Sequence, residues 1–419
     1  MTARRPLFAL LLVILVAGSS SAVAAGTPTP ASSLPPIKVG FYGALTGTFA
    51  SSGKDTLNGL TLFLKEINYT AAGRKIAVIM EDTAGDPGTA LAKARKLVEQ
   101  DKVDLLIGPT IAGEGYAVRD YIDQAKAPTL FQIVPSDDIT QRNRTPWIVR
   151  TGWTTSQPCH PFGKWVYDQG KRRVSIISYD QAFGWENVGG FQRTFEDAGG
   201  KVVQKIWTPQ VTSDFAPYFP VLKKDADAVV VSQSGGNATR FLQQWQEFGL
   251  NKTYPLYGVA AITDESILKT MGDEALGLFT ALQWSAALQT PVAQAFVRRF
   301  KEEYKDAPGY RAEAGYVAGR VLARALENTG GNPGTGMKLV EALRAVKISD
   351  APRGPISFDE YGGVVQNIYI RRVDRVGVEL QNTVIATLPS VSQFWTYDPK
   401  TYMSKPVYSR DYPPCTYCQ

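Results

Sequence analysis

The alternation of strand-like and helix-like segments constrains the fold of this chain more than any other feature. Short runs rich in β-branched residues occur at 37–45, 75–82 and 103–109, and segments with apolar residues at helical spacing lie between them, as at 56–68 and 89–100. Strands and helices in alternation predict a parallel sheet with helices on both faces. We therefore expect an α/β fold made of doubly wound parallel sheets.

The alternation stops near residues 147–157 and then starts again, which predicts two lobes. The first sheet has too few helices of its own to cover both faces, so later helical segments should return to it. We expect three crossings between the lobes, hence a hinge and a closing cleft. The predicted divisions are 37–151 with 279–352 for lobe 1, and 152–278 with 353–389 for lobe 2.

The two ends of the chain differ from the rest. Residues 1–24 combine Arg4 and Arg5, an apolar run and the small residues Ala22-Val23-Ala24, a pattern typical of a secretory signal peptide. We expect an exported, soluble protein. Residues 390–419 are rich in Tyr, Pro and Ser, and we expect this tail to pack on a lobe because so many aromatic residues are poorly suited to a free segment.

The charge of the chain argues against nucleic-acid binding. The net charge is +6 and falls to +4 without Arg4 and Arg5, the only charged residues of the predicted signal peptide. Basic residues are interleaved with acidic ones over the length of the chain, which is typical of solvated helix faces.

Residues 43–55, GALTGTFASSGKD, nearly match a phosphate-binding loop. Five residues instead of four separate Gly47 from Gly53, and Asp55 occupies the position at which a hydroxyl must bind magnesium. We therefore expect no nucleotide and no other cofactor. A Gly-rich turn before a helix still presents free N–H groups to an anion such as a carboxylate.

Catalytic and metal-binding residues are scarce. His160 is the only histidine, and neither a G-x-S-x-G nor an H-E-x-x-H motif occurs, so we expect no enzyme and no catalytic residue. The three cysteines and His160 make a poor zinc set because Cys159 and His160 are adjacent, and we expect no metal. A disulfide joining Cys415 to Cys418 is favoured, although pairing of Cys159 with a tail cysteine remains open.

Residues 37–53, 58–68, 81–109, 139–151 and 178–187 together resemble the type I periplasmic binding proteins of the branched-chain amino acid (Leu/Ile/Val) uptake class. The resemblance covers about residues 37–390 and rests on the ordered set of segments. It implies a solute receptor of an ABC importer that closes two lobes over a small ligand. The implied partners are the ligand and the membrane permease and ATPase subunits, and we expect a monomer.

The resemblance also implies which residues bind the ligand, at the carboxyl ends of the strands. On the first lobe the matched positions lie in three loops, and Gln132 and Ser136, like Thr110, are candidate replacements for hydroxyls that hold a carboxylate in the family. The full predicted set is Phe49, Ser52, Thr110, Ile111, Ala112, Gln132, Ile133, Val134, Pro135, Ser136, Phe183, Ser234 and Ala260.

Departures from the family pattern bear on the ligand. Amino-acid-binding members have an acidic residue at the position of Ala260, and an ammonium left without a partner in a dry cleft costs several kcal/mol. The tail, with its QFW segment at 393–395, resembles that of the subgroup importing aromatic acids. We expect a benzoate- or cinnamate-like ligand; the alternatives are an amino-acid receptor, a ligand-sensing module and, least favoured, an exported enzyme.

Overall fold

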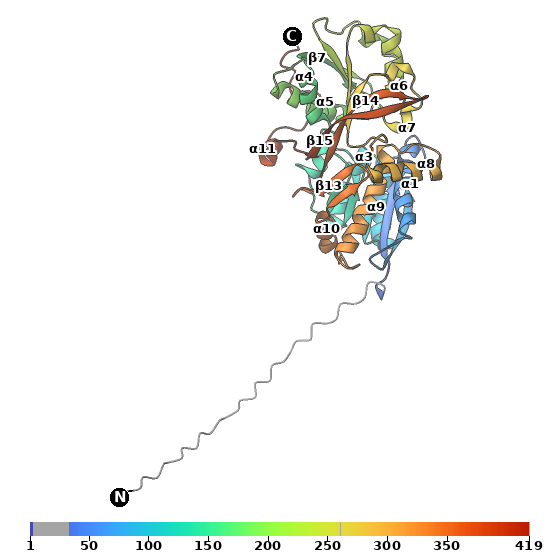
Figure 1. The fold of residues 1–419 in the computed structure, drawn as a ribbon, viewed down its shortest axis with the longest axis vertical. Helices are drawn as coiled ribbons and strands as arrows, with labels where there is room; N and C mark the ends of the chain where they lie inside the picture. Colours follow the sequence, from blue (N-terminus) through green and yellow to red (C-terminus); the bar gives the residue numbers. More distant parts are fainter. Residues whose placement is uncertain (3–32, 260, 419) are drawn as a thin grey trace.

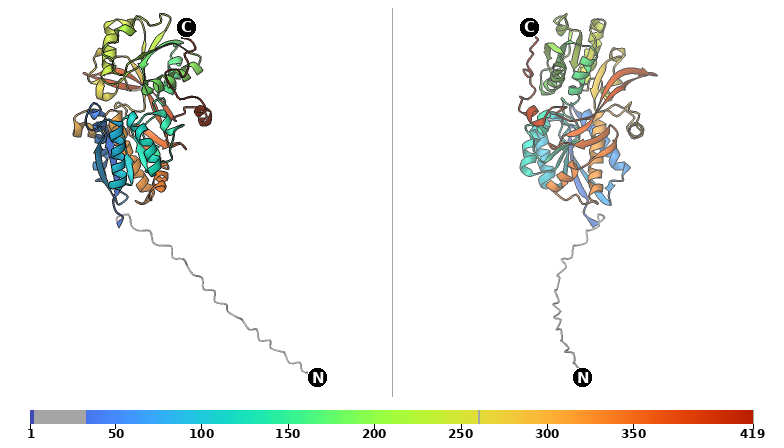
Figure 2. Two further views of the ribbon diagram at one scale, coloured as in Figure 1. Left: turned by 180° about the vertical axis from the view of Figure 1, so that it is seen from behind. Right: turned by 60° about the vertical axis from the view of Figure 1, so that its left-hand side comes forward.

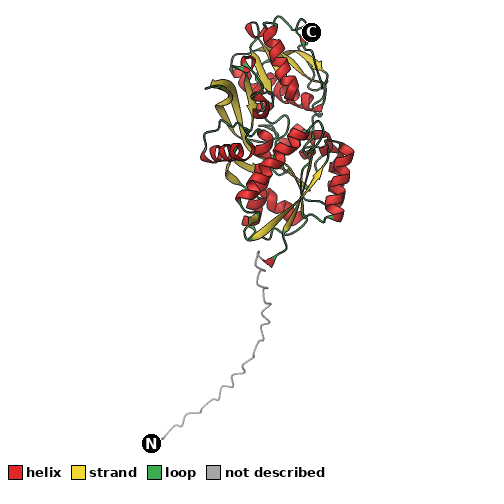
Figure 3. Cartoon of the chain, turned by 90° about the vertical axis from the view of Figure 1, so that its right-hand side faces the viewer, coloured by secondary structure: helices red, strands yellow, loops and turns green. Residues whose placement is uncertain are grey.

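The computed structural model describes residues 1–2, 33–259 and 261–418. Residues 33–259 and 261–418 form two lobes stacked along the long axis of the molecule (Figure 1). Most of the predicted signal peptide, and also Ala260, lie outside the described residues. Helices flank the strands in both lobes (Figure 3), so the predicted α/β fold is confirmed.

The first lobe contains a six-stranded sheet in the order β2-β3-β1-β4-β5-β6. All its neighbouring strands are parallel except the β2–β3 pair, and Val39 of β1 lies between Val78 of β3 and Leu105 of β4. The strands are β1 (Ile37–Gly43), β2 (Thr70–Ala71), β3 (Arg74–Asp82), β4 (Leu105–Ile107), β5 (Thr129–Phe131) and β6 (Ile148–Arg150).

Helices cover both faces of this sheet. On one face α1 (Ala50–Glu66) packs closely against α9 (Tyr310–Asn328), because Gly59 and Gly315 let the two backbones approach. The other face carries α2 (Pro87–Arg95) and α3 (Ala112–Ala125). Later helices thus return to the first lobe as predicted; α8 (Pro291–Tyr304) and α10 (Met337–Arg344) also join its core.

The second lobe is built on a nine-stranded mixed sheet in the order β12-β13-β14-β11-β10-β9-β7-β8, with β15 paired to β14. Helices α4 (Cys159–Asp168) and α5 (Ala182–Asp197) cover one face, and α6 (Gly235–Glu247) and α7 (Glu265–Leu268) cover the other. The strands are β7 (Arg173–Tyr179), β8 (Lys201–Thr208), β9 (Ala228–Ser232), β10 (Leu256–Val259), β11 (Phe279–Leu282), β12 (Ile348–Ala351), β13 (Gly354–Phe358), β14 (Val364–Val376) and β15 (Glu379–Val391).

The division between the lobes differs from the sequence prediction at two places. Strand β11 pairs with β10 and β14, so it belongs to the second sheet, although the predicted boundary before residue 279 assigned it to the first lobe. The chain therefore crosses after β11. In addition, Ile348, Ile356 and Val364 lie in the core of the first lobe, while β14 continues into the second sheet. A strand that serves both lobes has no signature in local periodicity.

Buried polar contacts fasten the crossing segments to one another. The fully buried Arg353 guanidinium contacts Glu313 (Nη1–Oε2, 3.1 Å) and donates a hydrogen bond to the carbonyl of Thr151. Gln366 donates to the carbonyl of Gly152 at 3.1 Å and to the side chain of Gln157 at 2.9 Å. These bonds join the first crossing to α9 and to the start of β14, and so define the hinge.

Candidate functional site

The loop after β1 forms one edge of the interlobe region. Asp82 accepts hydrogen bonds from the backbone of Leu45, Thr46 and Ala84 and from the Thr46 hydroxyl, and these bonds outweigh burial and lower the pKa of Asp82 to about 2. The loop leads into α1, whose N-cap residue, Phe49, is 37% exposed.

The first turn of α1 carries two residues of the predicted loop. Ser52 is half-buried there, and its carbonyl accepts a hydrogen bond from the Thr56 hydroxyl. Lys54, two residues further into the helix, is exposed.

The loop after β4 places Thr110, Ile111 and Ala112 at the start of α3. The hydroxyl oxygen of Thr110 accepts a hydrogen bond from the Ala44 amide at 3.0 Å, which ties this loop to the one after β1. Glu114 accepts from the amides of Thr110 and Ile111, at 3.2 and 3.0 Å, and also from the Thr83 hydroxyl. The start of α3 is therefore rigid, with Ile111 and Ala112 half-buried.

The loop after β5 is more deeply buried than the sequence suggested. Ile133 and Val134 belong to two hydrophobic cores, and Val134 packs against Gly115 of α3. The carbonyl of Pro135 accepts from the Thr155 amide at 2.8 Å, and that of Ser136 accepts from Arg150 at 2.7 Å. This segment thus supports the lobe, and contact of its side chains with a ligand stays a prediction.

In the second lobe, Phe183 and Ser234 lie at the starts of α5 and α6. Tyr179, the last residue of β7, bonds to Ser234 through its hydroxyl, with oxygen–oxygen distances of 3.1 Å to the carbonyl and 3.0 Å to the side chain. The Tyr179 and Phe183 rings are 6.5 Å apart. The structure thus brings these two predicted positions together; Ala260 is outside the described residues.

Three residues that the sequence pattern did not predict join Phe183 in a group of rings, which we call the aromatic cluster: Trp153, Tyr179, Phe183 and Tyr310. Trp153 packs edge-on against Phe183 (centroids 6.3 Å apart) and against Tyr310 (5.7 Å). Trp153 comes from the first crossing, Tyr310 from the start of α9, and the other two from the second lobe. Both lobes and the hinge therefore meet at these rings. Trp153 could have been found from the sequence, because it lies in the predicted crossing between the lobes. No feature of the sequence indicated Tyr310.

Charged side chains lie beside the aromatic cluster. The Arg311 guanidinium stacks over the Tyr310 ring, 4.6 Å from its centroid. Asp264 caps α7 and accepts from the amides of Ser266 and Tyr310, at 3.1 and 3.2 Å. Burial and then repulsion from Asp264 raise the pKa of Asp55 to about 6, although Arg311 lowers it. Arg311 is thus balanced by two nearby acids.

Several fully buried polar groups near the strand ends and the crossings have no hydrogen-bond partner among residues 33–259 and 261–418. They include both amide atoms of Gln132 after β5, both of Gln283 after β11, and the indole nitrogen of Trp153. Native proteins pair the large majority of such groups, and water or a ligand accounts for many exceptions. These donors and acceptors, which bond to no other group among the described residues, can bond to water or to a ligand.

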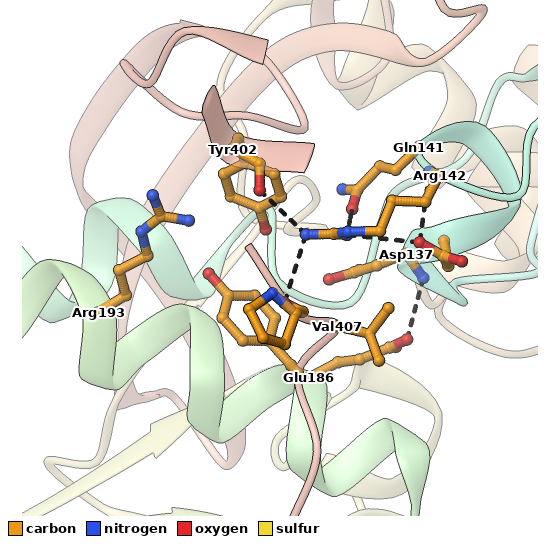
Figure 4. Close-up of a pocket in the computed structure, with 10 residues that line it drawn as sticks. Asp137, Gln141, Arg142, Glu186, Arg193, Tyr402 and Val407 are labelled. Atoms are coloured by element: carbon orange, nitrogen blue, oxygen red, sulfur yellow. Dashed lines mark hydrogen bonds and ion pairs between the residues drawn. The ribbon is translucent and has the colours of Figure 1, made fainter. Parts of the chain in front are cut away.

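The tail contacts both lobes along the side of the molecule, where α11 (Pro399–Met403) lies at the junction of the lobes (Figure 2). In Figure 4, Arg142 from the first lobe reaches the tail, donating to the carbonyl of Tyr402 at 3.0 Å, and Glu186 of α5 accepts from the Asp137 amide at 3.1 Å. A cavity of about 10 Å³ remains between these groups, large enough for a single water molecule. The tail therefore packs across the seam between the lobes and on more than one of them.

His160 and the cysteines have structural surroundings. His160 is buried beneath the tail, with its Nε2 3.1 Å from the Tyr408 hydroxyl, and burial and then Arg193 lower its pKa to about 3. Cys415 and Cys418 form a disulfide, and Cys159 is free and buried. The described part of the chain contains no group of three or more His, Cys, Asp or Glu side chains suited to a metal ion. It also contains no helix that is both long and apolar enough to cross a membrane.

Comparisons with known proteins agree with this architecture. The sequence profile of the family described as periplasmic binding protein matches residues 36–377. Leu/Ile/Val-binding protein homolog 6 of Brucella melitensis is 30% identical over 348 residues, which cover 80% of this chain and 87% of the relative.

Two solved structures extend the comparison to the fold. An ABC transporter substrate-binding protein from Sphaerobacter thermophilus has a TM-score of 0.83 at 35% identity, covering 85% of this chain and 99% of its own. A solute-binding protein of an ABC transporter from Rhodopseudomonas palustris BisB5, in complex with 3,4-dihydroxybenzoic acid, has a TM-score of 0.79 at 36% identity, covering 85% and 98%. With two lobes, a hinge and a family match over most of its length, the chain belongs to the periplasmic binding protein family and is a non-enzymatic solute-binding protein of an ABC transporter.

Proposed function

We propose that this protein binds a small carboxylated aromatic compound, of the benzoate or cinnamate type, between its lobes. The observation that carries the proposal is the aromatic cluster, in which Trp153, Tyr179, Phe183 and Tyr310 converge from both lobes and the hinge. Aromatic rings favour edge-to-face and offset contacts with other rings, so such a cluster suits a flat apolar ligand. The complex of the Rhodopseudomonas palustris relative with 3,4-dihydroxybenzoic acid supports the same ligand class.

The start of α3 is the proposed place for the carboxylate. Helix N-termini present unpaired amides and a positive end of the helix dipole, which favour anions. Since Glu114 already accepts the amides of Thr110 and Ile111, the amides proposed for the carboxylate are those of Ala112 and Gly113. Thr110 is bonded to Ala44 only as an acceptor, so its hydroxyl hydrogen is available to the ligand. Arg311 is a weaker candidate because Asp55 and Asp264 already balance its charge. Phe49, Ser52, Ile111, Ala112 and Ser234 are proposed as further contacts.

The second candidate is an amino-acid receptor, which the name of the Brucella melitensis relative and the two carboxylates beside Arg311 favour. An ammonium needs an unoccupied acidic partner. Asp264 already accepts the amides of Ser266 and Tyr310, and burial raises the pKa of Asp55 to about 6, which weakens Asp55 as a negative partner. The aromatic acid is therefore the better proposal.

A thermal-shift panel of benzoates, cinnamates, leucine and valine, followed by calorimetric titration of the compounds that stabilise the protein, tests the proposal. A ligand at 100 times its Kd stabilises the folded state by about 2.7 kcal/mol. We expect 3,4-dihydroxybenzoate or a related acid to raise Tm and the amino acids to leave it unchanged. Stabilisation by leucine or valine, with no response to any aromatic acid, would show that the ligand assignment is wrong.

The receptor is further proposed to act in the periplasm as a monomer that delivers its ligand to a permease and an ATPase. Uptake of the identified acid by cells should depend on this protein. Normal uptake in a deletion strain, with loss of a transcriptional response to the acid, would favour a sensing role instead.

A further inference from the structure

A large cavity lies at the side of the molecule, between α7, α8 and the hairpin formed by β14 and β15. Its volume is about 760 Å³, within the range of small-molecule sites. In Figure 1 the hairpin extends to the right, beside the labels of α7 and α8. None of the residues predicted for the interlobe site lines this cavity, whose lining includes Glu265, Leu268, Lys269, Val297, Lys301, Lys305, Val378, Leu380 and Asn382.

The walls of this cavity belong to both lobes. Helix α8 packs in the core of the first lobe through Phe296 and Phe300, whereas α7 and the hairpin belong to the second lobe. An ion pair between Lys269 after α7 and Asp306 after α8 spans the two sides. A molecule in the cavity would therefore contact both lobes at once.

Glu265 supplies a polar group that the protein leaves incompletely paired. This residue is only 7% exposed and lines the cavity. Its Oε1 accepts from the Asn382 side chain at 3.0 Å and from the Ala286 amide at 3.3 Å, whereas its Oε2 has no hydrogen-bond partner among the described residues. Nη1 of Arg371 lies 3.6 Å from Oε1 of Glu265. The guanidinium compensates the negative charge of Glu265 only in part, since burial still raises the pKa of this carboxyl group. A buried acceptor of this kind is costly without a donor.

The lining of the cavity has more cations than anions. Lys269, Lys301, Lys305 and Arg375 line it together with Asp306 and Glu379, and Lys269 is paired with Asp306 and Arg375 with Asp273. Lys301 and Lys305 are four residues apart at the end of α8, and both are exposed. The Lys305 ammonium donates a hydrogen bond to the Glu302 carbonyl at 2.6 Å, which leaves two of its N–H groups for an anion. Neither ammonium group forms an ion pair among the described residues.

Apolar side chains also line the cavity. They are Leu268, Met271, Val297 and Leu380, and the hairpin tip adds Val378, which is 92% exposed. Exposed apolar surface next to a polar rim is typical of a binding site. The lining therefore combines an unpaired acceptor, apolar side chains and cations.

We propose that this cavity is a second ligand site, which takes a small amphipathic anion with a hydrogen-bond donor at the end opposite its charge. The donor bonds to Oε2 of Glu265, the apolar body lies against α8 and the hairpin, and the anionic group lies between Lys301 and Lys305. An aliphatic hydroxy acid has this chemistry. The proposal does not depend on the identity of the interlobe ligand, so each can fail without the other.

Calorimetric titration of the full-length exported protein with 10-hydroxydecanoate, and separately with decanoate, tests the site. We expect 10-hydroxydecanoate to bind more tightly than decanoate, which lacks the donor. Lys301→Ala with Lys305→Ala should raise the Kd at least tenfold, and Val297→Trp should block binding by filling the cavity. Glu265→Met, which keeps the length of the side chain without a hydrogen-bonding carboxyl group, should remove most of the preference for the hydroxy acid.

The matched control is Lys338→Ala with Lys347→Ala, which removes two exposed lysines beside α10. This variant should bind 10-hydroxydecanoate with an affinity within twofold of the unaltered protein. The proposal is refuted if the unaltered protein does not bind the probe, or if the Lys301/Lys305 and Val297 variants bind it as well as the control does. Thermal unfolding of each variant confirms that it is folded.

Discussion

Replacing Phe183 by alanine is the sharpest test of the aromatic cluster, because this ring is the aromatic member of the second lobe's predicted contacts. Its centroid lies 6.3 Å from that of Trp153 and 6.5 Å from that of Tyr179. A ligand ring should cover roughly 50 Å² of Phe183, about a quarter of what an aromatic side chain buries in full. At about 25 cal/mol per Å², losing that contact costs about 1.3 kcal/mol. Losing the ring–ring geometry costs about 0.5–1.5 kcal/mol more.

The expected loss is therefore about 2 kcal/mol, which corresponds to a roughly thirtyfold increase in Kd for 3,4-dihydroxybenzoate. Calorimetric titration measures it directly. Phe183→Leu keeps apolar bulk without a ring and should lose only the ring–ring part, about two- to tenfold in Kd.

The matched control is Phe248→Ala, which removes a phenylalanine of the same lobe that is 53% exposed after α6 and packs on Phe219. Its affinity should equal that of the unaltered protein. If Phe183→Ala binds the acid within twofold of Phe248→Ala, the ligand does not contact the ring, and the proposed site is misplaced.

Two further predictions concern the lobes themselves. Gly59→Ala should destabilise the protein by about 3 kcal/mol or more in urea unfolding, because its Cβ would lie 1.7 Å from the carbonyl oxygen of Ala312; Gly236→Ala, which meets no atom within 4 Å, should not. Asp55→Asn should change the pH dependence of stability. The folded-state pKa of about 6 exceeds the unfolded value, so the unaltered protein loses stability as pH rises from about 4 to 6. Asp55→Asn lacks this loss, so the stability of the variant relative to the unaltered protein should rise by on the order of 1–3 kcal/mol between pH 4 and pH 7. A stability difference that is the same at pH 4 and at pH 7 contradicts the assignment.

The residues predicted to bind the ligand show which structural features a sequence pattern can and cannot predict. Thr110, Ile111 and Phe183 were predicted from the family resemblance, which places the ligand at the carboxyl ends of the strands, and the structure puts each of them at the start of a helix. Ile133 and Val134 were predicted by the same reasoning, yet the structure buries them in two cores. Position along a strand indicates which end of the sheet a residue occupies, whereas its burial depends on which helix covers that end.

The α/β class, the two lobes and the return of the later helices to the first lobe could be predicted from the sequence alone. These features follow from local periodicity and chain order, which short segments express independently of one another. The assignment of β11 to the second sheet, the sharing of β14 between the lobes, and the contacts of Trp153 with Phe183 and Tyr310 became visible only in the folded chain. Strand order and ring contacts join residues that are distant in sequence. The energy that stabilises them comes from packing between segments, which the periodicity of any one segment does not encode.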